Sequence, residues 1–309
     1  MNPRLVAIAG PTGAGKSALA LDLAEEFHGE IVNCDSLQLY RGFDIGTSKT
    51  PPGARRGIPH HLFDILPASR EFSAGEYAKA ARAAIGEIAA RASLPIVVGG
   101  SGFYLRALLE GLPETPERDA ELRAKLAQRE QRRPGSLHRL LARLEPARAR
   151  RIHERDIQKL IRALEIRILM RQPVLERSLA TPWRGYSILK LGLDPDRAPL
   201  YTRLDERVRW MFTSGIVEEV RRLLAEGATG GEKPFESLGY KQALAHVRGQ
   251  TTLEEAIAST QLETRRYAKR QWTWFRRDPE VRWLKGFGGD AAVRQQAFGA
   301  LQSFYKTCL

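Results

Sequence analysis

The stretch LVAIAGPTGAGKS, Leu5 to Ser17, decides the fold of this chain of 309 residues. Its apolar half, Leu5 to Ala9, has the length and composition of a buried parallel strand. The second half has the spacing G-x-x-x-x-G-K-[ST], and apolar residues at helical spacing follow as far as Phe27. A strand, a glycine loop and a helix in this order direct backbone N–H groups and a helix N-terminus at an anion. The stretch therefore predicts a phosphate-binding loop at the start of an α/β fold.

Two side chains of this loop have a predicted role. Lys16 adds a point charge for phosphate, and the hydroxyl of Ser17 can bind Mg²⁺. The simpler interpretation is a glycine-rich turn between a strand and a helix, in which the lysine has no function. The strand before the loop and the helix after it favour the phosphate site.

The composition of the chain excludes several classes of protein. No run of 18 apolar residues is present, which argues against a membrane span. Because the first predicted strand starts close to Met1, we expect no signal peptide. The two cysteines, Cys34 and Cys308, form neither a disulfide framework nor a metal-binding pattern. We therefore expect a cytoplasmic protein that does not bind a membrane.

The formal net charge of the chain is +13, and its isoelectric point is near 10.0. Between Glu117 and Arg177 there are 17 Lys and Arg but nine Asp and Glu, so this part of the sequence carries most of the excess. A local excess of this kind favours a polyanionic partner. A generally basic, Arg-rich proteome is the alternative explanation.

Four segments are predicted strands of one sheet: Leu5–Ala9, Glu30–Asp35, Leu94–Gly100 and Ser187–Asp194. A long helical stretch, Ser73 to Arg91, leads into the third of them. Alternating strands and helices predict a parallel sheet with helices on its faces. In such a sheet ligands bind at the carboxyl ends of the strands, so the residues that follow the strands are candidates for the site.

The composition changes between the third and fourth strands. Residues 117–176 are rich in Ala, Leu, Arg and Glu, with helical periodicity that is broken at RRPG (Arg132–Gly135) and ended at RQP (Arg171–Pro173). This predicts a helical insertion at residues 116–181 in a catalytic core of residues 1–115 and 182–309, joined near Pro113–Pro116 and Thr181–Pro182. The basic face of the insertion is either an RNA-binding surface or a solvated one. The last third of the chain, Leu200 to Trp274, is again predicted to be mostly helical.

A P-loop hydrolase or kinase usually has an acidic residue after a second strand, where the acid holds Mg²⁺. The third predicted strand ends in Gly99 and Gly100, and the one acid that we identify at a strand end is Asp35. A carboxylate beside a bound diphosphate could accept the proton of an attacking amine while diphosphate leaves. Alternatively, Asp35 caps a helix, because DSLQ resembles a capping box.

Five segments together resemble the tRNA dimethylallyltransferase family, also called tRNA isopentenyltransferases: GPTGAGKS, NCDSLQLYRGFDIGTSK, HHLFDI, IVVGGSGFYLRAL and RRYAKRQWTWFR. They follow the order and spacing of that family along essentially the whole chain, the helical insertion included. Some positions differ: Ala14 stands where the family often has Ser, GTSKT replaces GT-A-K-P, and Ser101 and Phe103 replace the common Thr and Leu. Apart from the hydroxyl that Ala14 lacks, these changes remove no functional group.

The resemblance implies a P-loop NTPase-like core with an inserted helical domain that binds tRNA. It also implies that dimethylallyl diphosphate alkylates N6 of adenosine 37, in tRNAs that read codons beginning with U, and that diphosphate is released. The nucleotide-binding loop would then hold an isoprenoid diphosphate with Mg²⁺ instead of ATP, which agrees with the missing acid. The family suggests a monomer.

The resemblance also implies roles in the donor site. Asp35 would be the general base for the adenine amine, and Thr12 would position the diphosphate oxygen next to the leaving carbon; the alternative for Thr12 is a hydroxyl that stabilises the loop. Arg207 would reach the diphosphate, unless it is a solvated residue like the nearby Arg203 or Arg209. The diphosphate site would be formed, with Mg²⁺ at its last residue, by Gly10, Pro11, Thr12, Gly13, Ala14, Gly15, Lys16 and Ser17.

On the RNA side, the resemblance implies contacts with the tRNA anticodon stem-loop. Gln38 has an amide that can pair with the edge of an extruded base, and Arg123 would bind a phosphate. Gln158 and Arg162 are four residues apart and share a helix face. The full set of implied contacts is Asp35, Ser36, Leu37, Gln38, Ser101, Arg123, Gln158, Lys159, Leu160, Ile161, Arg162, Glu236, Ser237, Leu238, Gly239, Tyr240 and Lys241.

The segment RRYAKRQWTWFRR, Arg265 to Arg277, interleaves cations with aromatic residues. It is either a surface on which RNA bases stack or, at helical spacing, a helix that packs its aromatic residues in the core. His60 and His61 have no Cys and no second His pair nearby, so we assign them no metal. Two other functions stay open: a small-molecule kinase with the same P-loop core, and an RNA-binding P-loop protein without catalysis.

Overall fold

The structure is a computed structural model, and it describes residues 2–113, 115–171 and 183–307. The chain divides into two compact units, one formed by residues 1–109 and 183–309 and the other by residues 110–182. The predicted junction at Thr181–Pro182, the end of the RQP segment at Pro173 and the second cysteine, Cys308, lie outside the described residues.

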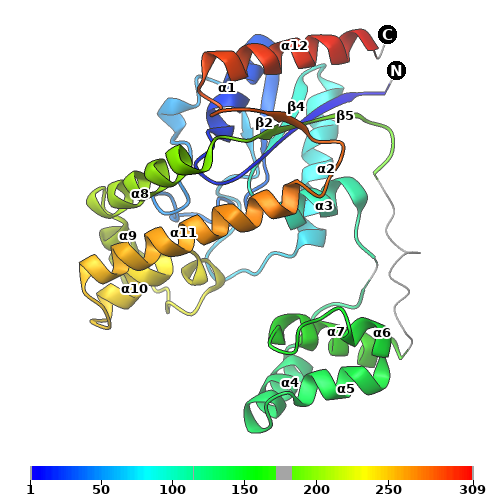
Figure 1. Ribbon diagram of the computed structural model, residues 1–309, viewed down its shortest axis with the longest axis vertical. Coiled ribbons are helices and arrows are strands. Elements are labelled where there is room, and N and C mark those ends of the chain that lie inside the picture. The colour runs from blue at the N-terminus through cyan, green and yellow to red at the C-terminus, as the bar shows by residue number, and fades with distance from the viewer. Residues whose placement is uncertain (1, 114, 172–182, 308–309) are drawn as a thin grey trace. The chain divides into compact units, whose positions relative to one another are not determined.

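A six-stranded parallel sheet lies at the centre of the first unit (Figure 1). The four predicted strands are confirmed, with ends that differ by one or two residues. Two short strands were missed, because segments of two and three residues show no periodic pattern. In spatial order the strands are β3 (His60–His61), β2 (Gly29–Asn33), β4 (Leu94–Val98), β1 (Arg4–Ala9), β5 (Ser187–Leu193) and β6 (Arg282–Leu284).

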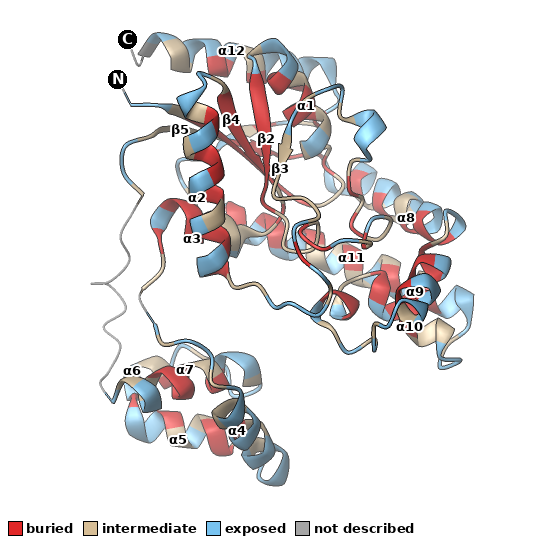
Figure 2. Cartoon of the chain, turned by 180° about the vertical axis from the view of Figure 1, so that it is seen from behind, coloured by how far each residue is buried: buried red, intermediate tan, exposed pale blue. Residues whose placement is uncertain are grey.

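Helices cover both faces of this sheet, as predicted. Successive side chains of a strand point to opposite faces, so Val6 packs in the cluster that includes α1 and α12, whereas Leu5 packs in the cluster that includes α2 and α3. The three central strands β2, β4 and β1 are almost completely buried between the two helical layers (Figure 2). The four helices are α1 (Lys16–Glu26), α2 (Ala74–Ala90), α3 (Gly102–Glu110) and α12 (Ala291–Thr307).

A further group of helices follows β5 in the same unit, which confirms the prediction of a mostly helical segment there. Its core contains Phe43, Phe235 and Tyr240, whose rings meet edge to face. Of the helices that the structure describes, none combines the length and apolar composition that a membrane span needs. The group consists of α8 (Arg197–Thr213), α9 (Ile216–Ala225), α10 (Tyr240–Val247) and α11 (Leu253–Phe275), and short 3-10 turns lie at Pro52–Ala54 and Lys233–Glu236.

The second unit has a core of its own, formed by apolar residues such as Leu126, Leu137 and Leu164. The RRPG segment separates its first two helices, as expected from the helix-breaking Pro and Gly. That this unit binds tRNA remains a prediction. Its described helices are α4 (Ala120–Arg132), α5 (Ser136–Leu144), α6 (Pro146–Ala149) and α7 (Ile157–Met170).

Candidate active site

The phosphate-binding loop joins β1 to α1, and its backbone needs its glycines. Gly15, directly before α1, has a φ of 88°, in the left-handed region that favours glycine. A Cβ atom on Gly15 would lie 2.9 Å from the amide nitrogen of Gly288. The amide of Gly288 donates a hydrogen bond of 2.8 Å to the carbonyl oxygen of Ala14. A second glycine loop, Gly286–Gly289, therefore lies directly against the first; it was not predicted from the sequence.

Substituting Gly288 with alanine is expected to lower the affinity of the loop for inorganic diphosphate about tenfold or more. The new Cβ atom would lie 2.2 Å from the carbonyl oxygen of Gly15, so the amides that face the anion must shift, and small displacements in a site cost binding and rate. Isothermal titration with diphosphate measures the change. Gly289→Ala is the matched control, because its Cβ atom would meet no atom within 4 Å. Equal affinities for the two variants would contradict the prediction.

The ammonium group of Lys16 lies inside the loop. Its Nζ atom donates to the carbonyl oxygens of Gly10 at 3.0 Å and Pro11 at 2.8 Å. Burial lowers the pKa of Lys16 to about 8, although the negative charge of Asp35 partly opposes this shift. A phosphate group bound in the loop would favour the charged form of Lys16, because a negative charge next to a lysine raises its pKa.

Thr12 is held by side chains from two distant helices. Its amide donates to Oε1 of Gln271 at 2.8 Å, and its hydroxyl accepts a hydrogen bond of 3.2 Å from Nη1 of Arg207. Arg207 is partly buried, whereas Arg203 and Arg209 are exposed. Of these three arginines on α8, Arg207 is therefore the one that reaches the loop.

Burial also lowers the pKa of Arg207. Burial, together with the positive charge of Arg203, lowers the pKa of Arg207 to about 10, and the charge of Asp35 partly compensates. Within the described part of the chain, the buried Nε atom of Arg207 has no hydrogen-bond partner. A buried guanidinium with an unpaired N–H group suits an anionic ligand, because such a ligand would supply both the charge and the acceptor.

Asp35 follows β2 and adopts an Asx turn. Its Oδ1 atom accepts the amide of Leu37 at 2.9 Å, and its own amide donates to Oδ1 of the buried Asn33 at 2.8 Å. In the described structure no α-helix begins at this segment, so the alternative of a helix cap is wrong. The other carboxylate oxygen of Asp35 has no hydrogen bond to a described residue, which leaves it available to a ligand. Asn33 was missed, although an Asn two residues before an Asp is a recognisable turn signal.

Lys16, Arg207 and Asp35 lie close enough to change one another's electrostatics. The charge of Asp35 raises the pKa of both cations, and the charge of Arg207 lowers the pKa of Lys16. Lys16 lies at the start of α1, Asp35 in the turn after β2, and Arg207 on α8. The structure thus brings two cations, a hydroxyl and a carboxylate together at the carboxyl ends of the strands, where α/β sheets bind ligands.

A second acid at a strand end was missed in the sequence. Asp194 follows β5, but its carboxylate is paired with Arg276 and Lys285, each at 2.9 Å. Burial alone would raise the pKa of Asp194, but these two cations hold it below its ordinary value. An acid that makes two ion pairs is a poor Mg²⁺ ligand. The argument against a phosphate-transfer enzyme therefore depends on Gly99 and Gly100, which follow β4 and offer no carboxylate.

Ser36, Gln38 and Ser101 lie beside Asp35. The hydroxyl of Ser101 accepts the amide of Ser36 at 3.0 Å, and the Nε2 atom of Gln38 donates to the carbonyl oxygen of Thr47 at 3.0 Å. Because the nitrogen and the oxygen belong to one planar amide, this hydrogen bond also fixes the direction of the Gln38 side-chain oxygen. The neighbourhood agrees with the implied RNA contacts, which themselves stay a prediction.

The segment Glu236–Lys241 divides into exposed and buried residues. Glu236 and Lys241 are exposed, whereas Tyr240 is completely buried. The Tyr240 hydroxyl donates to the buried carboxylate of Glu219 and accepts the amide of Gly46. The side chain of Tyr240 therefore packs in the core, and the buried Gly239 lies directly before α10; that these two residues contact RNA stays a prediction.

A buried carboxylate organises the implied RNA contacts of the second unit. Glu165 is completely buried, and its Oε2 atom pairs with Arg162 at 2.6 Å and with Arg123 at 3.1 Å. Arg162 also donates to Thr115 Oγ1 at 2.8 Å and to Pro116. Burial would raise the pKa of Glu165, but the hydrogen bonds and charges of the arginines hold it below its ordinary value. Both arginines therefore stabilise their own unit.

Two further implied contacts of this unit fall on buried residues. Leu160 is completely buried and Ile161 is 4% exposed, and both pack in the core of the unit. Their side chains are therefore not a surface for RNA. The exposed members of the segment are Gln158 and Lys159, because helical spacing turns one face inward and the other outward.

Replacing Arg162 with glutamine is expected to lower the local free energy of unfolding of the second unit by about 2–3 kcal/mol. This is below the usual cost of an unpaired buried charge, because Arg123 still pairs with Glu165. Amide hydrogen exchange in α4 and α7 of the intact protein measures the loss. Adding Glu165→Gln is expected to recover most of the stability. Unchanged exchange in the single variant would exclude a structural role for Arg162.

The cationic aromatic segment lies in α11, and both of its interpretations apply in part. Trp272 and Phe275 are buried at 7% and 4% exposure, whereas Trp274 is 39% exposed. Lys269 and Arg270 point to solvent. Most of the aromatic residues thus pack in the core, and Trp274 is the one with an open ring surface.

No three His, Cys, Asp or Glu side chains gather as a metal site among the residues that the structure describes. His61 lies 2.7 Å from Glu30, and Nδ1 of His60 lies 2.8 Å from a backbone oxygen. Mg²⁺ bound with a diphosphate needs few protein ligands, because phosphate oxygens and waters complete its shell. The exposed hydroxyl of Ser17 on the first turn of α1 fits such a site.

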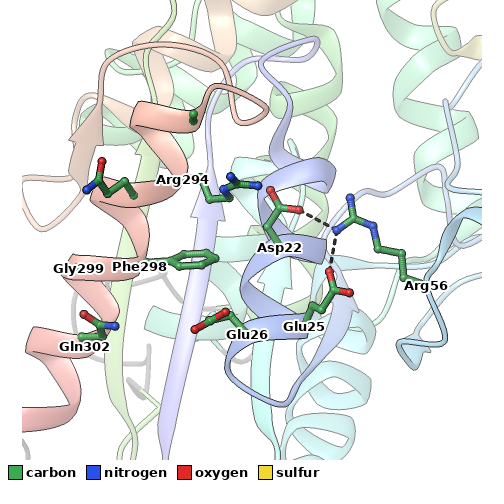
Figure 3. A pocket seen from close by; sticks show the side chains of 10 residues that line it. Asp22, Glu25, Glu26, Arg56, Arg294, Phe298, Gly299 and Gln302 are labelled. Carbon is green, nitrogen blue, oxygen red and sulfur yellow. Dashed lines mark hydrogen bonds and ion pairs between the residues drawn. The ribbon is translucent and has the colours of Figure 1, made fainter.

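A groove lies elsewhere on the first unit, between the exposed side of α1 and α12 (Figure 3). Arg56 lies at one side of it and pairs with Asp22 at 2.8 Å and with Glu25 at 3.0 Å, while Phe298 faces in from α12. None of the candidate site residues lines this groove. Three carboxylates and two arginines line it, so it lacks the excess of positive charge that an anion site needs, and it does not compete with the loop.

Comparisons with known proteins agree with the resemblance found in the sequence. The IPP transferase family model matches residues 38–278. The chain is 58% identical over 302 residues to a tRNA dimethylallyltransferase of Solibacter usitatus, covering 97% of this chain and 98% of that protein. It is 51% identical over 306 residues to a protein of the same name from Koribacter versatilis, covering 98% and 99%.

Solved structures give the same result. The tRNA isopentenylpyrophosphate transferase of Bacillus halodurans superimposes with a TM-score of 0.72 at 34% identity, covering 98% of both chains. A eukaryotic dimethylallyltransferase acting on tRNA has a TM-score of 0.80 at 26% identity, covering 99% of this chain and 80% of its own. From the length and identity of these matches, the chain belongs to the IPP transferase family.

Proposed function

We propose that the protein transfers the dimethylallyl group of dimethylallyl diphosphate to N6 of adenosine 37, in tRNAs that read codons beginning with U, and releases diphosphate. The named relatives at 51% and 58% identity support dimethylallyl transfer to tRNA. The atom, the position and the tRNA set are finer parts of the proposal and follow from the sequence resemblance. We also propose that the chain acts as a monomer in the cytoplasm.

The convergence of Lys16, Arg207, Thr12 and Asp35 at one edge of the sheet is the observation that carries this proposal. A phosphate-binding loop with two cations supports an anionic leaving group, and a carboxylate beside it supports proton removal from a nucleophile. A kinase would need an acid for Mg²⁺ after β4, where the chain has Gly99 and Gly100. The site thus favours loss of diphosphate over transfer of phosphate.

In the proposed reaction the adenine N6 atom attacks the first carbon of the dimethylallyl group, and a new N–C bond forms. The bond between that carbon and the diphosphate oxygen breaks, and its electron pair leaves with diphosphate. Asp35 accepts the proton that N6 loses, and Thr12 orients the departing oxygen. Lys16 and Arg207 neutralise the charge that develops on the diphosphate. Mg²⁺, when bound at Ser17, would add Lewis-acid stabilisation of the same charge.

One assay separates this function from its two rivals. The protein is incubated with Mg²⁺, labelled dimethylallyl diphosphate and an unmodified anticodon stem-loop RNA that contains A36-A37-A38. Label on the RNA, mapped by nuclease digestion to N6 of A37, supports the proposal. No label on the RNA overturns it. ATP turnover without transfer would then indicate a kinase, and RNA retention with neither activity would indicate a binding protein.

Exposed lysines of the two implied RNA segments are expected to bind backbone phosphates. Lys159→Gln and Lys241→Gln should each weaken stem-loop binding and reduce the slope of log K against log salt by about one. Filter binding across a range of salt concentrations measures the slopes. Lys79→Gln, an exposed lysine of α2 outside these segments, is the control and should leave the slope unchanged. Slopes equal to that control would remove the two segments from the RNA surface.

A further inference from the structure

Gln271 on α11 has a buried side chain, 5% exposed, that makes two hydrogen bonds. Its Oε1 atom accepts the amide of Thr12 at 2.8 Å, and its Nε2 atom donates to the carbonyl oxygen of Gly100 at 2.8 Å. The two partners determine the orientation of the amide, because a backbone N–H can only donate and a carbonyl can only accept. One side chain therefore joins the phosphate-binding loop to the loop after β4.

The contact with Gly100 leaves no space for a larger residue. A Cβ atom on Gly100 would lie 2.3 Å from Nε2 of Gln271 and 3.9 Å from Nζ of Lys16. At Gly100, which follows β4 and has no side chain, α11 thus approaches the phosphate-binding loop. The absence of a side chain at this position makes the bridging hydrogen bond possible.

The loop after β4 also supports the carboxylate of Asp35. The hydroxyl of Ser101 accepts the amide of Ser36 at 3.0 Å, and the amide of Ser101 donates to the carbonyl oxygen of Cys34 at 3.2 Å. Cys34 and Ser36 are the two neighbours of Asp35 in the chain. Gln271 therefore connects two parts of the proposed site through a few hydrogen bonds. One is the phosphate-binding loop at Thr12, and the other is the turn that contains Asp35.

We propose that Gln271 is a positioning residue that sets the distance between the departing diphosphate and the carboxylate of Asp35. The inference rests on the proposed transferase function. Alkyl transfer requires the nucleophile, the carbon and the leaving oxygen in line, and a displacement of about 1 Å can cost about 100-fold in rate. Each half of the site keeps its own contacts without Gln271. Its loss therefore lowers kcat and leaves the KM of each substrate nearly unchanged.

Two substitutions of Gln271 test this role. Gln271→Leu has similar size and neither hydrogen bond, so kcat is expected to fall about 10- to 100-fold, with the KM for dimethylallyl diphosphate within about threefold. In Gln271→Glu, only the protonated acid can donate to the Gly100 carbonyl, and burial raises the pKa of a carboxyl group. The kcat of the Glu variant, divided by that of the wild type, should therefore rise as the pH is lowered from about 8 to about 6. The same ratio for the Leu variant should stay flat.

Gln261→Leu is the matched control. Gln261 lies on the same helix, and its Nε2 atom donates to the carbonyl oxygen of Asp205 on α8 at 3.1 Å, away from the loop. Its kcat is expected to equal that of the wild type. Amide hydrogen exchange adds a readout without catalysis, because the Thr12 amide should exchange faster in Gln271→Leu than in Gln261→Leu.

The outcomes separate the inference from the function on which it rests. Normal kcat in Gln271→Leu, with normal transfer by the wild type, overturns the positioning role alone. If Gln271→Leu does not fold, a pH-independent ratio for Gln271→Glu overturns it. No transfer by the wild type overturns the transferase function and with it this inference. A low kcat with unchanged KM, together with the rising ratio of the Glu variant, supports it.

Discussion

Replacing Asp35 with asparagine is expected to lower the turnover number of dimethylallyl transfer about 100-fold or more. The amide cannot accept the proton of adenine N6, and general-base effects have this size. Asparagine keeps an oxygen that can accept the amide of Leu37, so the Asx turn should survive the change. Single-turnover transfer of label to the stem-loop RNA measures the chemical step directly.

The control for this variant is Asp196→Asn, which changes an exposed carboxylate before α8 that caps no helix amide. Its turnover should equal that of the wild type. Unchanged binding of diphosphate and RNA by Asp35→Asn would show that the loss lies in the chemistry. A turnover within about threefold of the wild type would rule out Asp35 as the base.

Replacing Lys16 with alanine is expected to lower kcat/KM for dimethylallyl diphosphate by about 100- to 1000-fold, the usual loss when one stabilising donor of a developing anion is removed. The pH profile of the wild type should report the ionisation of the Lys16 ammonium group. Because burial lowers the pKa of Lys16 to about 8, the ammonium is present below that pH and is lost above it. Steady-state kinetics between about pH 6.5 and pH 9.5 should therefore show kcat/KM falling as the pH rises through about 8.

The variant supplies the control for this profile, because Lys16→Ala should lack the alkaline limb. A second control is Lys190→Ala, which removes a lysine paired with Asp278 and Glu280 on another part of the sheet. It should keep both the rate and the limb. An alkaline limb that persists in Lys16→Ala would have to belong to another group, and the assignment of the charge to Lys16 would be wrong.

The core fold was predictable because its signals are local and periodic. The four longer strands are short apolar runs, and α2 begins at a Ser73–Glu76 capping box that can be recognised in the sequence. The strands β3 and β6 carry no such signal. They form because neighbouring strands offer unpaired backbone groups, which is a property of the finished sheet.

The candidate site was predictable only in part. The glycine loop and Asp35 are visible as motifs, whereas the hydrogen bond from the Thr12 amide to Gln271 joins residues 259 positions apart. Gly288 has the same limitation, because its importance depends on which backbone atom lies opposite. Leu160, Ile161 and Tyr240 show another limit, because a resemblance covers a whole segment whereas burial decides which of its side chains face outward.

The hydrogen bonds that complete the donor loop have a consequence for synthesis on the ribosome. The loop itself emerges within the first 17 residues, but Arg207, Gln271 and Gly288 all lie in the last third of the chain. A nascent polypeptide that ends before Gln271 therefore has the glycine motif without the hydrogen bond that Gln271 accepts from Thr12. Such a premature product would lack an organised donor site, so alkylating capacity arises only when translation is nearly complete.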